Sequence, residues 1–174
     1  MLRRTMVFGA LVVVMAGPSL VVGADKPAVE ARAAFDRLKT LAGDWSAVME
    51  GENEPGEIAY RLTANDSVLM ETLFPGTPHE MVTMYHLDGD ELKLTHYCAA
   101  KNQPRLRLDR AASTADDLVF VFDGGTNFDP AKDMHMREAR ITFAGEGKVK
   151  SRWDAYQAGK LLHSASFTLT KPSK

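Results

Sequence analysis

The chain has little cysteine and no excess of basic residues, and each shortage excludes a class of protein. It has a single cysteine, Cys98, among 174 residues, so it forms no internal disulfide and must be stabilised by its core. Its 21 basic and 23 acidic residues nearly balance, which removes the electrostatic signature of a nucleic-acid-binding protein. With 45% hydrophobic and 25% charged residues, the composition indicates one ordinary globular domain.

One long apolar run is present, at the N-terminus. Arg3 and Arg4 precede an uncharged stretch over residues 6–16, which Pro18 separates from small residues ending at Ala24. This order is typical of a secretory signal peptide, so we expect residues 1–24 to be removed by cleavage after Ala24. The alternative, an uncleaved membrane anchor, is disfavoured because no basic stop-transfer cluster follows. We therefore expect export to a periplasm or secretion, with no stable membrane span after cleavage.

The segment 25–42 is predicted to contain the one helix of the chain, from Pro27 to Ala42. Pro27 suits the first turn of a helix, and Gly43 suits the position after its end. An apolar face is predicted by residues at spacings of three and four: Ala31, Ala34, Phe35, Leu38, Leu41 and Ala42.

From Trp45 onward the hydrophobic period changes to two, which predicts strands. Turn residues such as Asn65-Asp66, Asp88-Gly89 and Ala158-Gly159 separate the runs. Ten runs are predicted: Trp45–Glu50, Glu57–Thr63, Ser67–Phe74, Glu80–Leu87, Glu91–Cys98, Arg105–Arg110, Leu118–Asp123, Met134–Phe143, Lys148–Ala155 and Lys160–Thr170.

Ten strands linked by hairpins form one large antiparallel sheet, and closing that sheet on itself buries one face without leaving open edges. The predicted fold is therefore all-β, a single closed antiparallel barrel over residues 43–174 with the N-terminal helix capping one end. A barrel of this strand number has a lumen wide enough for a small ligand.

Alternation within each run assigns side chains to the lumen. In the run 91–98, His96 shares a face with Leu92 and Leu94. In the run 148–155, Trp153 faces the lumen and the adjacent Arg152 faces the other side. We expect a three-residue loop at 157–159, because it brings the final run into register with Trp153. Six side chains are predicted to line the lumen and meet a ligand: Tyr85, His96, Cys98, His135, Trp153 and His163.

The histidines support two interpretations. Neutral imidazoles in an apolar lumen can hold a ligand, including haem or a transition metal, or they can be hydrogen-bonded core residues. The histidines are too scattered in the sequence to predict a metal site, and no cofactor is predicted. His96 and Cys98 share a strand face, but no third orienting group accompanies them, so the chain is interpreted as leaning away from an enzyme. Glu71 is the one acid inside an apolar run.

Two loops carry further candidates. The loop 124–130 lacks the lysine and the strand-to-helix setting of a phosphate-binding loop, and we expect it to act as a flap with Phe128 closing a barrel mouth. Asn102 and Gln103 follow the run 91–98 and are candidates for contacts at the rim.

The segment Leu41-Ala42-Gly43-Asp44-Trp45 resembles the entrance motif of lipocalin and calycin barrels. In those barrels the tryptophan closes the base under a cationic side chain, so the resemblance implies this role for Trp45 with Arg140 or Arg152. The stretches 74–81, 84–90 and 95–98 resemble bacterial lipocalin-like families of the DUF1579 kind, which implies a fold and no activity. A more distant similarity of shape to nitrobindin, a haem barrel, points to His163.

The sequence thus predicts an exported lipocalin-like barrel that binds a small apolar molecule without catalysing a reaction. The alternative is a haem- or metal-binding barrel that uses a lumenal histidine, with an enzyme as the third interpretation. Nucleic acid is not expected as a partner.

Overall fold

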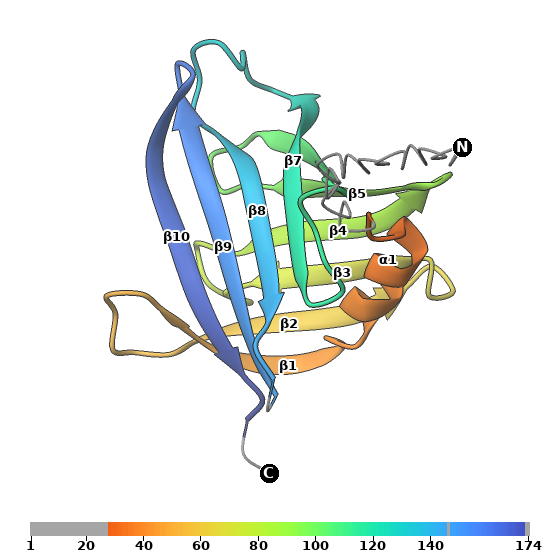
Figure 1. Ribbon diagram of the computed structural model, residues 1–174. Coiled ribbons are helices and arrows are strands. Elements are labelled where there is room, and N and C mark those ends of the chain that lie inside the picture. The colour runs from red at the N-terminus through yellow and green to blue at the C-terminus, as the bar shows by residue number, and fades with distance from the viewer. Residues whose placement is uncertain (1–27, 146, 173–174) are drawn as a thin grey trace, which may run out of the picture.

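The computed structural model describes residues 28–145 and 147–172, so the predicted signal peptide lies outside the described residues. One helix precedes ten strands (Figure 1). Their bounds are α1 (Ala31–Lys39), β1 (Gly43–Met49), β2 (Gly56–Thr63), β3 (Val68–Leu73), β4 (Met81–Asp88), β5 (Glu91–Tyr97), β6 (Gln103–Leu108), β7 (Asp117–Thr126), β8 (His135–Phe143), β9 (Lys148–Gln157) and β10 (Lys160–Thr170).

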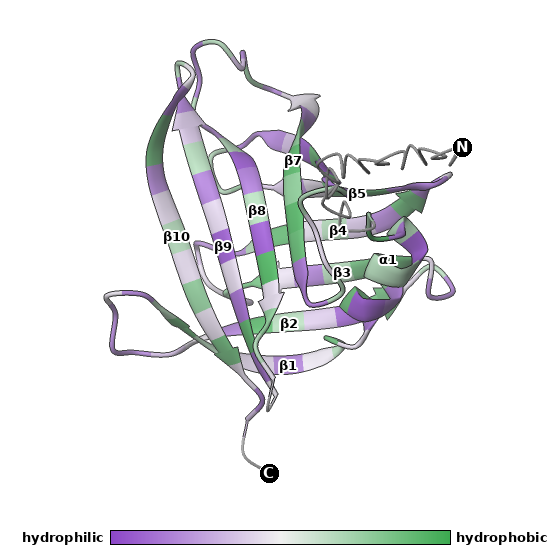
Figure 2. Ribbon diagram, in the orientation of Figure 1, coloured by the Kyte–Doolittle hydropathy of each residue, from purple (hydrophilic) through white to green (hydrophobic). Residues whose placement is uncertain are grey.

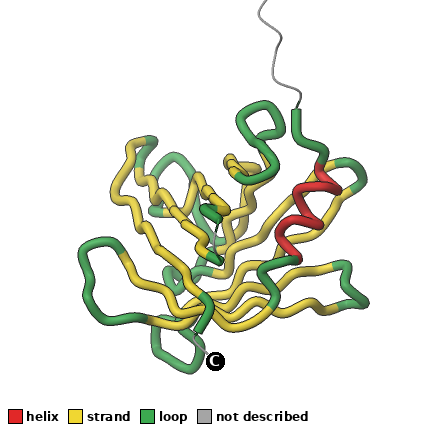
Figure 3. Tube along the Cα trace, turned by 60° about the horizontal axis from the view of Figure 1, so that its bottom comes forward, coloured by secondary structure: helices red, strands yellow, loops and turns green. Residues whose placement is uncertain are grey.

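The strands form a closed antiparallel barrel, which confirms the predicted fold class and strand number. Each strand pairs with its neighbours in the chain, and β10 pairs with β1 through the register Ala47↔Leu169. Strands β8 to β10 cross the direction of β1 to β5 steeply (Figure 1), and the turned view in Figure 3 shows the strands curving around one interior. Closure leaves no open edge, as the ten-run pattern predicts.

The period of two in the sequence produces the barrel's inner and outer faces. In β5 the even-numbered Leu92, Leu94 and His96 are buried, while Glu91 and Tyr97 are exposed. Figure 2 shows the same alternation of hydrophobic and hydrophilic residues along β8 and β9. The inward side chains of all ten strands join α1 in one hydrophobic cluster, so the protein has a single core.

The helix α1 is shorter than the predicted span 27–42. The chain just before the helix is held by Arg110. The Arg110 carbonyl accepts a hydrogen bond from the Val29 backbone N–H (3.1 Å), and Arg110 Nε donates to the Val29 carbonyl (3.0 Å). The last turn of the helix tightens where the Leu41 N–H donates to the Leu38 carbonyl (2.9 Å). The helix buries Phe35 and Leu38 against the barrel beside β4 and β5. Among the described residues, none of the helical segments combines the length and the apolar character needed to cross a bilayer.

The β9–β10 hairpin differs from the predicted three-residue loop. Gln157 pairs with Lys160 across the two-residue turn Ala158-Gly159, and a register shift then falls between Leu161 and His163. This β-bulge adds one residue to β10 and restores the parity that the two-residue turn alone would lose. The pairing of Ala165 with Trp153, and hence the inward face of the lower half of β10, follows from the bulge.

Candidate functional site

A buried carboxyl group lies at the centre of the barrel's polar interior. Glu71 on β3 is fully buried and accepts hydrogen bonds from two phenols, Tyr60 Oη to Oε1 and Tyr85 Oη to Oε2, both at 2.7 Å. Thr83 pairs with Glu71 across β3 and β4, and hydrogen bonding by its hydroxyl lowers the pKa of the Glu71 carboxyl group. The polar neighbours of the carboxyl group are thus three hydroxyl groups, those of Tyr60, Tyr85 and Thr83.

Strand register explains why these residues meet. Tyr60 pairs with Glu71 across β2 and β3, Glu71 with Thr83 across β3 and β4, and Thr83 with His96 across β4 and β5. Paired residues of antiparallel strands point to the same face, so four consecutive strands place one polar row in the interior. We call this set, Tyr60, Glu71, Thr83 and His96, the polar row.

The polar row ends at an aromatic contact. Thr83 Oγ1 and His96 Nδ1 are 3.0 Å apart, and the His96 ring lies 4.9 Å from the Trp153 ring between centroids. Trp153 donates from its indole N–H to Ser151 Oγ at 3.1 Å. The histidine is thus held between a hydroxyl group and an indole from the opposite side of the barrel.

Burial sets the protonation states of Glu71, of the two tyrosines that contact it and of His96. Loss of solvation raises the pKa of Glu71, an effect that the hydrogen bonds from Tyr60 and Tyr85 oppose. Burial and the neighbouring Glu71 also raise the pKa values of both tyrosines, which therefore remain phenols. Burial lowers the pKa of His96 from 6.5 to about 4, so the imidazole is neutral at pH 7.

Two buried imidazole nitrogens have no hydrogen-bond partner among the described residues: Nε2 of His96 and Nε2 of His135. Nearly all buried polar atoms in folded proteins are hydrogen-bonded, and an unmade bond costs about 1–3 kcal/mol. Arg37 Nε and Asn102 Oδ1 are also buried without a partner among the described residues. A polar atom of a ligand at either imidazole nitrogen would supply the missing hydrogen bond.

The second nitrogen belongs to an aromatic cluster at one barrel mouth. His135 Nδ1 lies 2.9 Å from the Asp133 carbonyl oxygen, and the ring stacks on Phe128 with 4.7 Å between centroids. Phe122 approaches the same imidazole at 5.0 Å. Phe128 therefore covers His135, as expected of a flap residue.

The end of the β5–β6 turn and the first residue of β6 hold both ends of the loop that carries Phe128. Asn102 donates from Nδ2 to the Met134 carbonyl at 2.7 Å. Gln103 Oε1 accepts from Thr126 Oγ1 at 3.0 Å and from Asn127 Nδ2 at 2.6 Å. The two predicted rim residues thus position the flap, although Asn102 is itself buried.

Of the six side chains predicted in the lumen, four are buried: Tyr85, His96, His135 and Trp153. Cys98 follows the last residue of β5 and is half-buried, at the start of a turn in which its backbone N–H donates to the Asn102 carbonyl. The structure therefore joins Tyr85, His96 and Trp153 in one region and places Cys98 at its edge.

The placement of His163 in the lumen is wrong. His163 pairs with Ala155 beyond the β10 bulge, but its side chain is exposed. The neighbouring residues of β10, Leu161 and Leu162, are also exposed. Alternation gives the face of a strand, but it does not show where a strand extends past the packed interior.

The assignment of Arg140 and Arg152 to the barrel base is also wrong. Trp45 is buried as predicted and donates its indole N–H to the Leu41 carbonyl at 2.7 Å. The cation over its ring is Lys171, the residue directly after β10, with Nζ 5.3 Å from the centroid. Arg140 and Arg152 lie on the outer wall instead.

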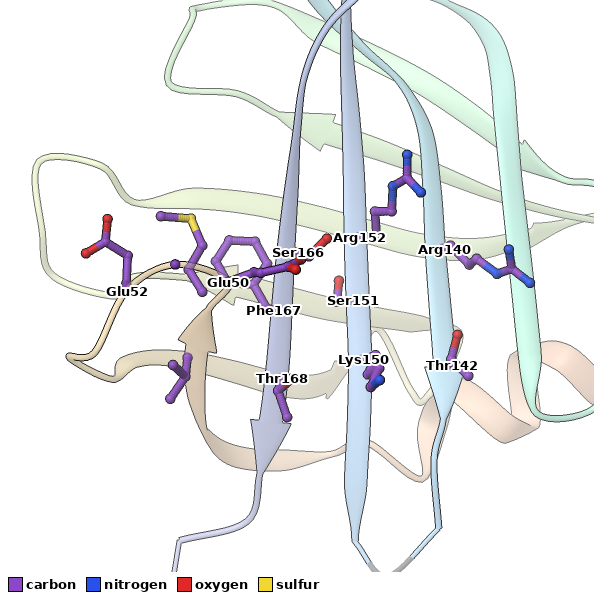
Figure 4. Close-up of a pocket in the computed structure, with 13 residues that line it drawn as sticks. Glu50, Glu52, Arg140, Thr142, Lys150, Ser151, Arg152, Ser166, Phe167 and Thr168 are labelled. Carbon is purple, nitrogen blue, oxygen red and sulfur yellow. The ribbon is translucent and has the colours of Figure 1, made fainter.

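A cavity of about 530 Å³ lies on that outer wall, over β1 and β8 to β10 (Figure 4). Arg140 and Arg152 pair across β8 and β9, and both line the cavity. Arg140 Nε donates to Asp117 Oδ1 at 2.8 Å, and Arg152 Nε donates to Asp154 Oδ1 at 2.9 Å. The lining also includes Lys150, Glu50 and Glu52, so the wall carries both signs of charge.

Three members of the polar row, Tyr60, Glu71 and Thr83, are absent from the predicted ligand contacts. Tyr60 and Thr83 lie at buried positions of their strands, and Thr83 shares the predicted inner face of its run with Tyr85. The available signal was Glu71: an acid inside an apolar run needs donors, and the paired positions on the adjacent strands supply them.

In the part of the chain that the structure describes, no three His, Cys, Asp or Glu side chains are grouped in a way that would hold a metal ion. Comparison with protein-family models and with curated proteins finds no match to this chain.

Proposed function

We propose that the protein is an exported, non-catalytic barrel that binds a small apolar molecule in its lumen. The observation that carries this proposal is the buried Nε2 of His96, which lacks a partner among the described residues and lies where the polar row meets the hydrophobic core. Small-molecule sites are typically apolar cavities with a few placed polar groups, and His96 supplies such a group.

Entry to the lumen runs through the mouth that Phe128 covers. The loop between β7 and β8 carries Phe128 on His135 and is held by the side chains of Asn102 and Gln103. Because a ring contact and a few hydrogen bonds retain it, this loop is the segment that a ligand displaces. The second unpartnered nitrogen, on His135, becomes accessible when Phe128 leaves.

The pKa of His96 argues against catalysis. A general base is most effective when its pKa lies near the working pH, whereas burial lowers that of His96 to about 4. A neutral, weakly basic imidazole suits a hydrogen-bonding anchor better than a proton-transfer group.

Export and family membership are part of the same proposal. The arginine pair, the apolar run and the small residues ending at Ala24 support a signal peptide over residues 1–24. The likeness to lipocalin barrels rests on the motif ending in Trp45, whose buried place at the barrel base fits that of the motif tryptophan. The likeness to DUF1579-type families rests on the stretches 74–81, 84–90 and 95–98. Mass measurement of the exported chain tests this part, with an N-terminus at Asp25 as the expected result.

Trp153 provides the test of ligand binding. In a Trp45→Phe chain the remaining indole lies against His96, so we expect an apolar ligand to shift or quench its emission. A titration series of fatty acids, esters, ketones and haem is the probe, and native mass spectrometry of protein from its source looks for a retained adduct. No change of emission with any probe would contradict the proposal.

The alternative is a haem or metal protein that uses a lumenal histidine. The same unpartnered nitrogens of His96 and His135 favour it, because neutral imidazole coordinates haem iron and transition metals. Protein from its source would then show a Soret band or a stoichiometric metal by elemental analysis. A metal-free and colourless preparation removes this alternative and leaves the first proposal intact.

A further inference from the structure

The polar row connects Glu71 to the unpartnered nitrogen of His96 through Thr83. Glu71 pairs with Thr83 across β3 and β4, so both side chains point to the interior, and the Thr83 hydroxyl is a hydrogen-bonding neighbour that affects the pKa of the carboxyl group. Thr83 Oγ1 lies 3.0 Å from His96 Nδ1. A threonine hydroxyl carries one hydrogen, so it can donate to only one of these two neighbours. The protonation of Glu71 therefore decides which nitrogen of His96 carries the ring hydrogen.

The surroundings of Glu71 favour the neutral acid. The groups that face it are Tyr60 from β2, Thr83 and Tyr85 from β4, and apolar core side chains. No hydrogen bond or ion pair from a cationic side chain reaches Glu71 among the described residues. A buried carboxylate without a cation costs several kcal/mol, and burial raises the pKa of Glu71 accordingly.

The hydrogens of a neutral Glu71 can be assigned one by one. Tyr60 and Tyr85 each donate to one carboxyl oxygen, so the acid hydrogen of Glu71 is directed to Thr83, the remaining neighbour. The Thr83 hydroxyl then donates its own hydrogen to His96 Nδ1. A neutral imidazole with an accepting Nδ1 carries its hydrogen on Nε2, and every group in the chain is satisfied except that N–H.

We infer that Glu71, acting through Thr83, holds His96 as the Nε2–H tautomer, so that the lumen selects apolar ligands that carry a hydrogen-bond acceptor such as a ketone, ester or carboxylate. This inference rests on the proposed function for its ligand, but the tautomer belongs to the protein alone. Glu71 and Thr83 are positioning residues, and His96 Nε2 makes the contact.

Nitrogen-15 NMR of histidine-labelled protein tests the tautomer without a ligand. We expect His96 to show a protonated Nε2 and an unprotonated Nδ1 that accepts a hydrogen bond. Glu71→Gln is the matched variant, because its amide N–H can replace the acid hydrogen toward Thr83 and should preserve the same tautomer. A wild-type His96 protonated on Nδ1 overturns the inference, because it means that Glu71 is ionised and accepts from Thr83. A wild-type Nε2–H tautomer that changes in Glu71→Gln also overturns it, because a donor at position 71 would then not set the ring hydrogen.

Two probes of equal chain length, 2-dodecanone and dodecane, test the ligand class. We compare the ratio of their dissociation constants in the wild type and in His96→Phe, which keeps an aromatic ring and removes the N–H. Loss of one hydrogen bond should reduce the relative preference for the ketone by about tenfold. An unchanged ratio overturns the acceptor selection while the proposed lumen binding stands. If neither probe binds, nor any of the wider panel, the proposed function itself fails, and the NMR result still decides the tautomer.

Discussion

At the residue scale, the polar row is a fully buried carboxyl group whose partners come from neighbouring strands. Glu71 has no exposed surface, and both phenols that donate to it are equally buried. A buried polar group that lacks a hydrogen-bond partner destabilises the folded state much more than one whose partners are all present. The energetic importance of Glu71 therefore lies in its complete set of donors.

Tyr85→Phe tests this dependence. The variant removes one hydroxyl group from a 2.7 Å hydrogen bond to Glu71 Oε2 and leaves the ring in place, including its contact with Phe120. We expect the free energy of unfolding to fall by about 1–3 kcal/mol in urea denaturation, the cost of an unsatisfied buried acceptor. Tyr97→Phe is the control, because Tyr97 is 48% exposed and should tolerate the change. Equal stabilities of the two variants would contradict the interpretation.

The titration of His96 should appear in the stability of the protein. Its pKa is about 4 in the folded state against 6.5 ordinarily, so the folded state resists protonation. The stabilisation is complete above pH 6.5 and is lost as pH falls toward 4, by about 3 kcal/mol. Glu71 acts with the opposite sign, because its raised pKa favours the folded state at low pH.

Urea denaturation at pH 7 and pH 4 measures this loss. Between pH 7 and pH 4 the free energy of unfolding should fall by about 3 kcal/mol less in His96→Asn than in the wild type, because the variant has no buried imidazole to protonate. His163→Asn provides the matched control at an exposed histidine and should lose as much as the wild type. If His96→Asn retained the full pH dependence, the buried imidazole would not be its source.

At the element scale, the flap loop and the hairpin bulge show what strand patterns leave open. The run of ten strands follows from the change of period at Trp45, and nearly all predicted bounds lie within a few residues of those observed. The bulge between Leu161 and His163 is different, because a three-residue loop and a two-residue turn with a bulge give the same parity. Only the pairing of Gln157 with Lys160 distinguishes them.

Gly125→Ala tests the attachment of the flap. A methyl group at this position would lie 2.4 Å from the Phe128 ring and 2.8 Å from the Gln103 carbonyl oxygen, so Phe128 must move off His135. We expect a loss of about 1–3 kcal/mol in unfolding free energy, as for other overpacked sites. Gly89→Asn is the control, since its turn position at φ +62° suits asparagine and nothing lies within 4 Å. An unaffected Gly125→Ala would contradict the close contact.

At the scale of the whole molecule, closure was predictable and the composition of the interior only partly so. The inward faces of Tyr85, His96 and Trp153 follow from alternation within single strands. To predict the polar row, one must know the pairing register of four strands, and the sequence of a single strand does not determine that register. The cation over Trp45 comes from Lys171, beyond the last strand, where no periodic pattern extends.

The single core has a consequence for unfolding. Trp45 lies at the barrel base and Trp153 lies in the interior beside His96, and both belong to the one hydrophobic cluster that includes α1 and every strand. A closed barrel with one core should unfold in a single cooperative step. The single-tryptophan variants Trp45→Phe and Trp153→Phe should therefore each give a fluorescence transition in urea that coincides with the circular dichroism transition of the same sample. Comparing the two probes within each variant removes the effect of the substitution on stability. A Trp45 signal lost before the strands melt would show that the base opens separately from the barrel, and the idea of one cooperative core would then be wrong.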